Sequence, residues 1–282
     1  MPQRYFIWFA YNGARYHGWQ VQPNGNSVQA ELEKALATLL RMPVPTTGAG
    51  RTDAGVHASC MVAHFDLDRD IDCDQLAYKL NRLLPYDIAV SRIQPVQPDM
   101  HARFSAVART YHYYIHTAKD PFCTFSSCRL HYQLDFDAMN RAAAILLQTA
   151  DFASFCKSHA DVKTTLCQVS QAQWQQVAPH QWRFVITANR FLRNMVRAVV
   201  GTLIDVGRGR ISVEEFRQIV AEKKRTSAGE SMPGHALYLV DVRYPFDAPA
   251  AADVLPDAGS LLAQPAVDAA PAFVPSPNAP LS

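Results

Sequence analysis

The chain is 282 residues long, enough for two modest domains or one large domain with a substantial core. Hydrophobic residues make up 49% and charged residues 18%, which excludes the composition of a disordered or fibrous chain. We find neither an apolar stretch near the length of a membrane span nor a signal-peptide pattern, so we expect a cytoplasmic protein without membrane contact.

The net charge of +2 is unevenly distributed along the chain. Residues 247–282 hold four aspartates and no Lys or Arg, so the rest of the chain carries 27 basic against 21 acidic side chains. This moderately basic body is compatible with a nucleic-acid partner without requiring one. The six cysteines form no CxxC pair and no paired zinc-ligand spacing, so we expect free thiols and no metal.

Strand and helix signals alternate along the first hundred residues. Ser27 is a typical N-cap, and apolar residues recur on one helical face after it until Pro43 stops the pattern. The predicted elements are strands at 4–11, 60–65 and 88–93 and helices at 28–40 and 73–84. This order fits an α+β sandwich of the split βαβ type.

A comparable order of elements follows. It comprises strands at 108–116, 165–177, 181–188 and 236–244, and helices at 136–147, 190–206 and 212–223. We therefore predict an α+β protein with two ferredoxin-like halves, a domain at 1–105 and a domain at 106–246, with a cleft between them. Residues 247–282 contain seven prolines and eleven alanines, and we predict a disordered tail there.

The most informative segment is residues 48–58, with the sequence GAGRTDAGVHA. Its glycines and alanines leave the carboxylate of Asp53 exposed to a docking partner, and Arg51 can hold that charge or a phosphate. A lone Asp-x-Gly is usually a turn, but the whole string is much less common by chance. His57 lacks the partners of a metal site or a catalytic triad, so we expect it to pin the loop by hydrogen bonding.

The predicted strand at 108–116 carries cationic and aromatic side chains. Arg109, Tyr111 and Tyr113 share one face of it. Such a face can stack nucleic-acid bases, and it can equally pack beneath a helix. The pattern alone leaves both readings open.

Residues 189–197 are predicted to open a helix with Arg193 and Arg197 four positions apart. An exposed pair of arginines is usually a solvated face, but an arginine beside the apolar stripe can reach a carboxylate, and Asp53 is the candidate. Two more segments combine aromatic with polar or basic residues and suit either a structural role or RNA contact, namely 101–106 with Arg103 and 16–20 with Trp19.

Taken in order, these motifs resemble the tRNA pseudouridine synthase A family. The resemblance covers roughly residues 4–245, and Asn12 and Ala236 depart from the family pattern. The matching segments are Tyr16-x-Gly18-Trp19-Gln20, Gly50–His57, Asn81–Val90, His101–Ala106, Arg109-x-Tyr111-x-Tyr113, Phe191–Arg197 and Leu237–Leu239.

The resemblance implies isomerisation of uridine to pseudouridine at positions 38, 39 and 40 of the tRNA anticodon stem-loop. It also implies an extended mixed sheet with a central catalytic cleft, and a homodimer that holds one tRNA across both subunits. The reaction is redox-neutral, so we expect no cofactor.

Site roles follow from the same resemblance. Asp53 would be the nucleophile, Tyr111 would stack on the base and take part in proton transfer, and Arg197 would pair with Asp53 and keep it ionised. The expected substrate-binding residues are Arg51, Tyr111, Leu237, Leu239, Arg103, Arg109 and Trp19. The sequence does not show which atom Asp53 attacks.

Two other functions remain open at this point. A non-catalytic RNA-binding module made of two RRM-like halves would suit the aromatic strand, but it gives no reason for Asp53, since a carboxylate facing phosphates weakens binding. A pseudouridine synthase with another RNA target is the second, because target choice depends on cleft shape.

Overall fold

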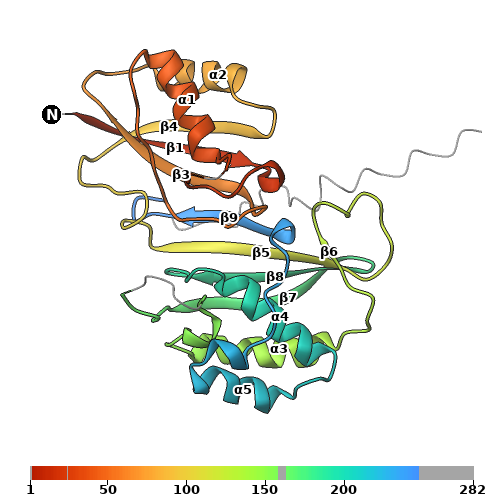
Figure 1. Cartoon of the computed structure of the whole chain (residues 1–282). Helices are drawn as coiled ribbons and strands as arrows, with labels where there is room; N and C mark the ends of the chain where they lie inside the picture. The colour runs from red at the N-terminus through yellow and green to blue at the C-terminus, as the bar shows by residue number, and fades with distance from the viewer. Residues whose placement is uncertain (1, 24, 158–162, 248–282) are drawn as a thin grey trace, which may run out of the picture. The chain divides into compact units, whose positions relative to one another are not determined.

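The computed structural model describes residues 2–23, 25–157 and 163–247, and these residues belong to one compact unit (Figure 1). The tail predicted at 247–282 lies, apart from Asp247, outside the described residues. The predicted α+β class is confirmed, because helices pack on one large mixed sheet.

The sheet contains nine strands among the described residues. Seven of them follow the order β4-β1-β3-β9-β5-β8-β7, while β2 pairs with β3 and β6 pairs with β5. The strands are β1 (Gln3–Tyr11), β2 (Thr47–Gly48), β3 (His57–Leu67), β4 (Ile88–Val96), β5 (Ala108–His116), β6 (Cys128–Arg129), β7 (Val169–Ala178), β8 (Gln181–Ala188) and β9 (Leu237–Arg243).

The last strand, β9, lies between the two halves of the chain. It runs parallel to β3, with His57 opposite Tyr238, and antiparallel to β5, with Tyr111 opposite Leu239. One continuous sheet therefore crosses the junction, as Figure 1 shows. The division into domains at residue 105 stays a prediction, and the strand that joins the halves comes from the far end of the sequence.

Five α-helices pack on this sheet within the described residues: α1 (Val28–Leu40), α2 (Cys73–Leu83), α3 (Phe136–Ile145), α4 (Met195–Gly207) and α5 (Val213–Glu222). Each of the first three begins at a Ser or Asp whose side chain accepts a backbone N–H, and α5 begins with a full capping box at Ser212. Contacts of α2 with β4 and of α3 with β7 place helices on both halves.

The start predicted for α4 is wrong by five residues. The helix begins at Met195 instead of residue 190, because Asn194 adopts a left-handed conformation with φ of 67°. Arg193 therefore precedes the helix and does not share a helical face with Arg197. The apolar stripe of α4 is present as expected, and most of its residues are buried.

The six cysteines are free thiols, as their spacing indicated. No helix in the described part of the chain is long and apolar enough to cross a membrane.

Candidate active site

The loop that carries Asp53, residues 49–56, is held on both sides of the carboxylate. Before it, the Thr52 hydroxyl lies 2.8 Å from the phenol oxygen of Tyr11. After it, Gly55 donates its N–H to the Tyr16 carbonyl at 3.2 Å and adopts a φ of +75°, which favours glycine. These contacts fix the backbone while the Asp53 side chain keeps 28% of its surface exposed.

Two arginines from the second half of the chain face Asp53. Nη1 of Arg197 lies 3.2 Å from Oδ2, and Nε of Arg193 lies 3.9 Å from Oδ1. The Arg197 side chain is 23% exposed and that of Arg193 is 61% exposed, so the first is the better shielded partner. An arginine within hydrogen-bond distance fixes the orientation of the carboxylate and places positive charge beside it.

Residues 229–236 form a segment that holds the Arg197 side chain in place. The sequence patterns did not predict a role in the site for this segment. Nε of Arg197 donates to the Met232 carbonyl, and the Met232 N–H donates to the Arg197 carbonyl at 3.1 Å. The Tyr113 hydroxyl donates to the Pro233 carbonyl at 3.1 Å. The Pro233-Gly234 turn signal was the one sequence cue to this segment.

His57 pins the same region, as the sequence indicated. Its Nδ1 accepts the N–H of Gly13 at 3.1 Å, and its Nε2 lies 2.9 Å from the His235 carbonyl. An Nδ1 that accepts and an Nε2 that donates define a neutral imidazole. Burial lowers the pKa of His57, and its ring stacks on Tyr238 at 4.5 Å between centroids.

Tyr111 borders the carboxylate from β5. Its side chain is 9% exposed, and its ring meets the edge of Phe191 at 5.0 Å between centroids. Burial raises the pKa of Tyr111 to about 12, Arg109 opposes that shift, and the negative charge of Asp53 adds to it. The phenol therefore stays protonated at neutral pH.

The other predicted substrate residues divide by exposure. Arg51 and Arg103 are exposed, and the Arg103 guanidinium lies over the ring of Phe104 at 5.5 Å. Leu237 and Leu239 are buried in β9, where they pair with Tyr113 and Tyr111 across the ladder.

Trp19 and Arg109 lie beneath the surface of the site. Trp19 is 3% exposed, packs on Phe9, and fills the space beside Gly48, where a Cβ would lie 2.5 Å from its Nε1. Arg109 is 9% exposed and bonds to main-chain carbonyls. For both, direct contact with substrate stays a prediction.

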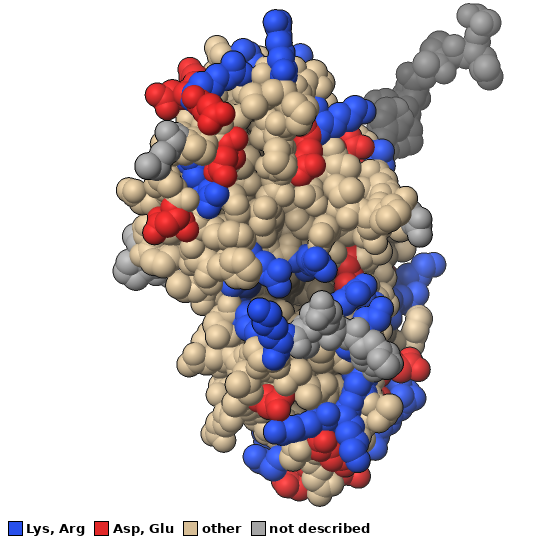
Figure 2. All heavy atoms as spheres, turned by 60° about the vertical axis from the view of Figure 1, so that its left-hand side comes forward, with Lys and Arg blue, Asp and Glu red and all other residues tan. Residues whose placement is uncertain are grey.

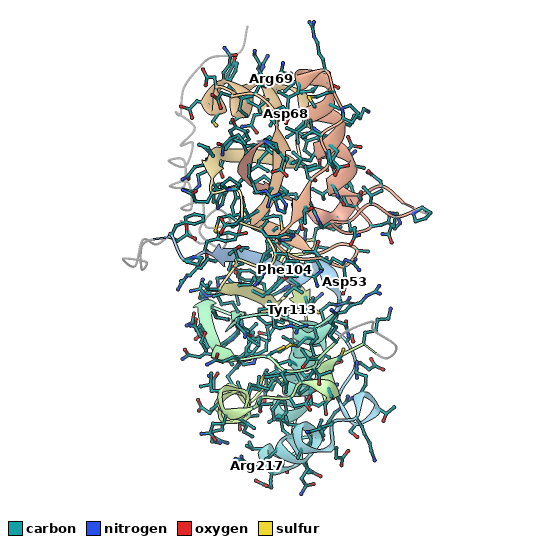
Figure 3. All side chains as sticks on the ribbon, turned by 90° about the vertical axis from the view of Figure 1, so that its left-hand side faces the viewer. Asp53, Asp68, Arg69, Phe104, Tyr113 and Arg217 are labelled. Atoms are coloured by element: carbon teal, nitrogen blue, oxygen red, sulfur yellow. The ribbon has the colours of Figure 1, made fainter. Side chains whose placement is uncertain are left out.

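Positive charge gathers on the face that carries Asp53. Figure 2 shows Lys and Arg side chains around a hollow at the height of β9 and β5. In Figure 3, Asp53, Phe104 and Tyr113 lie at that same level, between Asp68 near one end and Arg217 near the other. Exposed Arg51, Arg193 and Lys157 contribute to this charge, and the Lys157 N–H donates to the Arg193 carbonyl at 3.1 Å.

Within the described ranges, no group of three or more His, Cys, Asp or Glu side chains is arranged to hold a metal ion. A partly exposed carboxylate paired with arginine, a buried tyrosine beside it and a cationic surface around it stand at the junction of one mixed sheet. These features make the junction the candidate active site of a mixed α+β protein.

Comparison with known proteins specifies the class. The sequence profile of the tRNA pseudouridine synthase family matches residues 7–105 and 142–245. The chain is 57% identical over 244 residues to tRNA pseudouridine synthase A of Bacteroides fragilis, covering 86% of this chain and 97% of that protein. It is 42% identical over 240 residues to tRNA pseudouridine synthase A of Bacillus subtilis, covering 83% and 96%. The chain therefore belongs to the tRNA pseudouridine synthase family, which confirms the resemblance and makes it an isomerase.

Proposed function

We propose that this protein converts uridine to pseudouridine at positions 38, 39 and 40 of the tRNA anticodon stem-loop, with Asp53 as its nucleophile. The observation that carries the proposal is the Asp53 carboxylate, partly exposed and 3.2 Å from Arg197. Its neighbours supply a protonated phenol and a cationic surface, and the matched family and the named relatives act on tRNA uridine.

The reaction breaks the bond between N1 of uracil and C1′ of the ribose. The uracil then turns so that C5 forms a new bond to C1′, C5 loses its proton and N1 gains one. Atoms and electrons balance without an external reagent. Asp53 would form the covalent intermediate that divides this exchange into two steps, and Arg197 would hold the attacking carboxylate in its orientation.

Tyr111 would lie against the flipped base. A flipped nucleotide is usually read by stacking on an aromatic ring and by hydrogen bonds to its edge. Because its pKa is raised to about 12, the Tyr111 hydroxyl stays protonated at neutral pH and can donate a hydrogen bond to the base. Leu237 and Leu239 would form the apolar floor of the pocket that receives the flipped base.

Arg51 and Arg103 would hold the RNA around the flipped nucleotide. Both are exposed, and Arg51 lies two residues from Asp53. An arginine there can bind a phosphate with two parallel hydrogen bonds or occupy the gap that the base leaves. We expect that replacing either arginine by alanine raises KM by a larger factor than it lowers kcat.

The family resemblance leads us to propose also that the protein is cytoplasmic and forms a homodimer that holds one tRNA across its two subunits. Light scattering of the purified chain, alone and with tRNA, tests the stoichiometry.

The central test uses the purified full chain and an unmodified tRNA transcript labelled with tritium at C5 of uridine. The wild type should release tritium, and mapping should locate pseudouridine at positions 38–40. Asp53→Asn should bind tRNA and release no tritium, whereas the matched control Asp68→Asn, an exposed aspartate far from the site in Figure 3, should behave as the wild type. Turnover by Asp53→Asn would refute the assignment of the nucleophile, and pseudouridine at other positions would refute the assignment of the target.

A further inference from the structure

Arg109 makes an unusual set of contacts for a buried cation. Nη1 donates to the carbonyls of Ala106 at 3.0 Å and Asn189 at 2.8 Å. Nη2 donates to the carbonyls of Ala49 at 3.0 Å and Arg103 at 2.5 Å. The four N–H groups on the terminal nitrogens of a guanidinium therefore have four main-chain acceptors.

The acceptors belong to three segments that build the site. Ala49 begins the Asp53 loop, Arg103 and Ala106 lie in the connection between the two halves, and Asn189 precedes the residues that lead to Arg197. These segments are far apart in the sequence. One rigid, planar group bonded to all of them sets the separation between the Asp53 loop and the segment before α4.

The electrostatic environment supports a geometric role for Arg109. Among the residues that the structure describes, no carboxylate forms an ion pair with it, and burial lowers its pKa. Removing a charge from water without an opposite charge beside it is costly, so stability alone does not explain this buried guanidinium. Its charge does act on the site, because it lowers the pKa of Tyr111, two residues along β5, against the larger upward effect of burial.

We propose that Arg109 is a positioning residue that holds the Asp53 loop in register with Arg197 and Tyr111. This role replaces the substrate contact that the resemblance implied for Arg109: it acts through main-chain carbonyls, since its terminal N–H groups are occupied within the protein. This inference rests on the proposed function, because it concerns the geometry in which Asp53 attacks.

The test compares kcat, KM and tRNA Kd for the wild type, Arg109→Lys and Arg109→Ala in the full chain. An ammonium has three donors in a tetrahedral arrangement and cannot satisfy four carbonyls held around a plane. Both variants should lose at least about tenfold in kcat, because small displacements of reacting groups are costly, while Kd changes less than about twofold. Guanidinium ion at millimolar concentration should restore part of the kcat of Arg109→Ala, whereas sodium at equal ionic strength should not.

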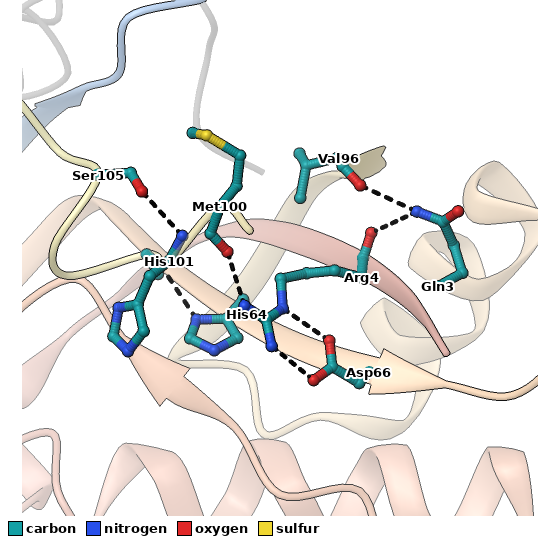
Figure 4. Close-up of polar contacts among 9 residues, drawn as sticks. Gln3, Arg4, His64, Asp66, Val96, Met100, His101 and Ser105 are labelled. Atoms are coloured by element: carbon teal, nitrogen blue, oxygen red, sulfur yellow. Dashed lines mark hydrogen bonds and ion pairs between the residues drawn. The ribbon is translucent and has the colours of Figure 1, made fainter. Parts of the chain in front are cut away.

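Arg4 offers a matched control at the other end of the same connection. Its guanidinium binds both oxygens of Asp66, at 2.7 and 2.8 Å, and the Met100 carbonyl at 2.9 Å (Figure 4). Arg4→Met should lower the melting temperature and leave kcat within about twofold of the wild type. Assays run well below every melting temperature then separate loss of fold from loss of register.

The outcomes are distinguishable. An inactive wild type, or an active Asp53→Asn, contradicts the proposed function and not the positioning role of Arg109. If the wild type is active and Asp53→Asn is not, an unchanged kcat in Arg109→Lys overturns the positioning role. A raised Kd with unchanged kcat also overturns it, because that result means Arg109 contacts RNA. If Arg109→Ala does not fold, Arg109→Lys decides the matter alone.

Discussion

Gly201 lies in the interior of α4, where helix propensity alone predicts that alanine would stabilise the protein by about 1 kcal/mol. The tertiary structure predicts the opposite. A Cβ at this position would overlap the carbonyl oxygen of Glu230 and lie 3.0 Å from its carbonyl carbon. The segment that crosses α4 there is residues 229–236, which supports Arg197.

Relief of this overlap requires the main chain at Glu230 to move by about 1 Å, given ordinary contact distances. Three hydrogen bonds resist the movement: the Gly229 N–H donates to the Thr202 hydroxyl at 2.9 Å, the Met232 N–H to the Arg197 carbonyl at 3.1 Å, and the Arg197 Nε–H to the Met232 carbonyl. Weakening two of them costs about 1–3 kcal/mol, and overpacking costs a similar amount. After the gain of about 1 kcal/mol in propensity, Gly201→Ala should be destabilised by about 3 kcal/mol.

Urea unfolding followed by far-ultraviolet circular dichroism measures this difference, and tritium release measures kcat. We expect Gly201→Ala to lower kcat as well as the free energy of unfolding, because displacement of Met232 removes the carbonyl that orients Arg197. Gly207→Ala is the matched control for kcat, since it lies in the same helix and its Cβ would press on the buried side chain of Met139, away from residues 229–236. A Gly201→Ala variant as stable as the wild type, with normal kcat, would refute the reasoning about this crossing.

Further predictions concern single groups. Arg197→Lys keeps a cation facing Asp53 but loses the Nε–H bonded to Met232, so kcat should fall about 10–100-fold, as single-turnover assays would show. Tyr111→Phe should lower kcat with little change in urea midpoint, because its hydroxyl has no hydrogen-bond partner among the described residues. Burial is the main cause that lowers the pKa of His64 to about 4. As the pH falls from about 6.5 to 4, the unfolded chain therefore binds a proton on His64 that the folded chain does not, and the free energy of unfolding should fall by at most about 3 kcal/mol. The loss should be smaller in His64→Asn, as urea unfolding at each pH would show. Deletion of residues 248–282 should leave activity nearly intact, since the family match ends at residue 245; a large loss would contradict this.

Local signals in the sequence were sufficient for most of the secondary structure. The strand at 108–116 and the helix capped by Ser27 occur where alternation, apolar periodicity and a capping residue placed them. The Asp53 loop could be recognised as well, because its glycines and its carboxylate are neighbours in the chain. Each of these features depends on interactions within a few residues, which is the range over which sequence patterns are informative.

Only the tertiary structure decided how the site is assembled. The insertion of β9 between β3 and β5, the crossing of residues 229–236 over α4 and the four carbonyls around Arg109 all join segments remote in the sequence. Main-chain carbonyls carry no signature of residue type, so a pattern of side chains cannot predict which of them an arginine will bind. The sequence by itself determined the chemical groups of this protein, and the packing of distant segments determined where those groups meet.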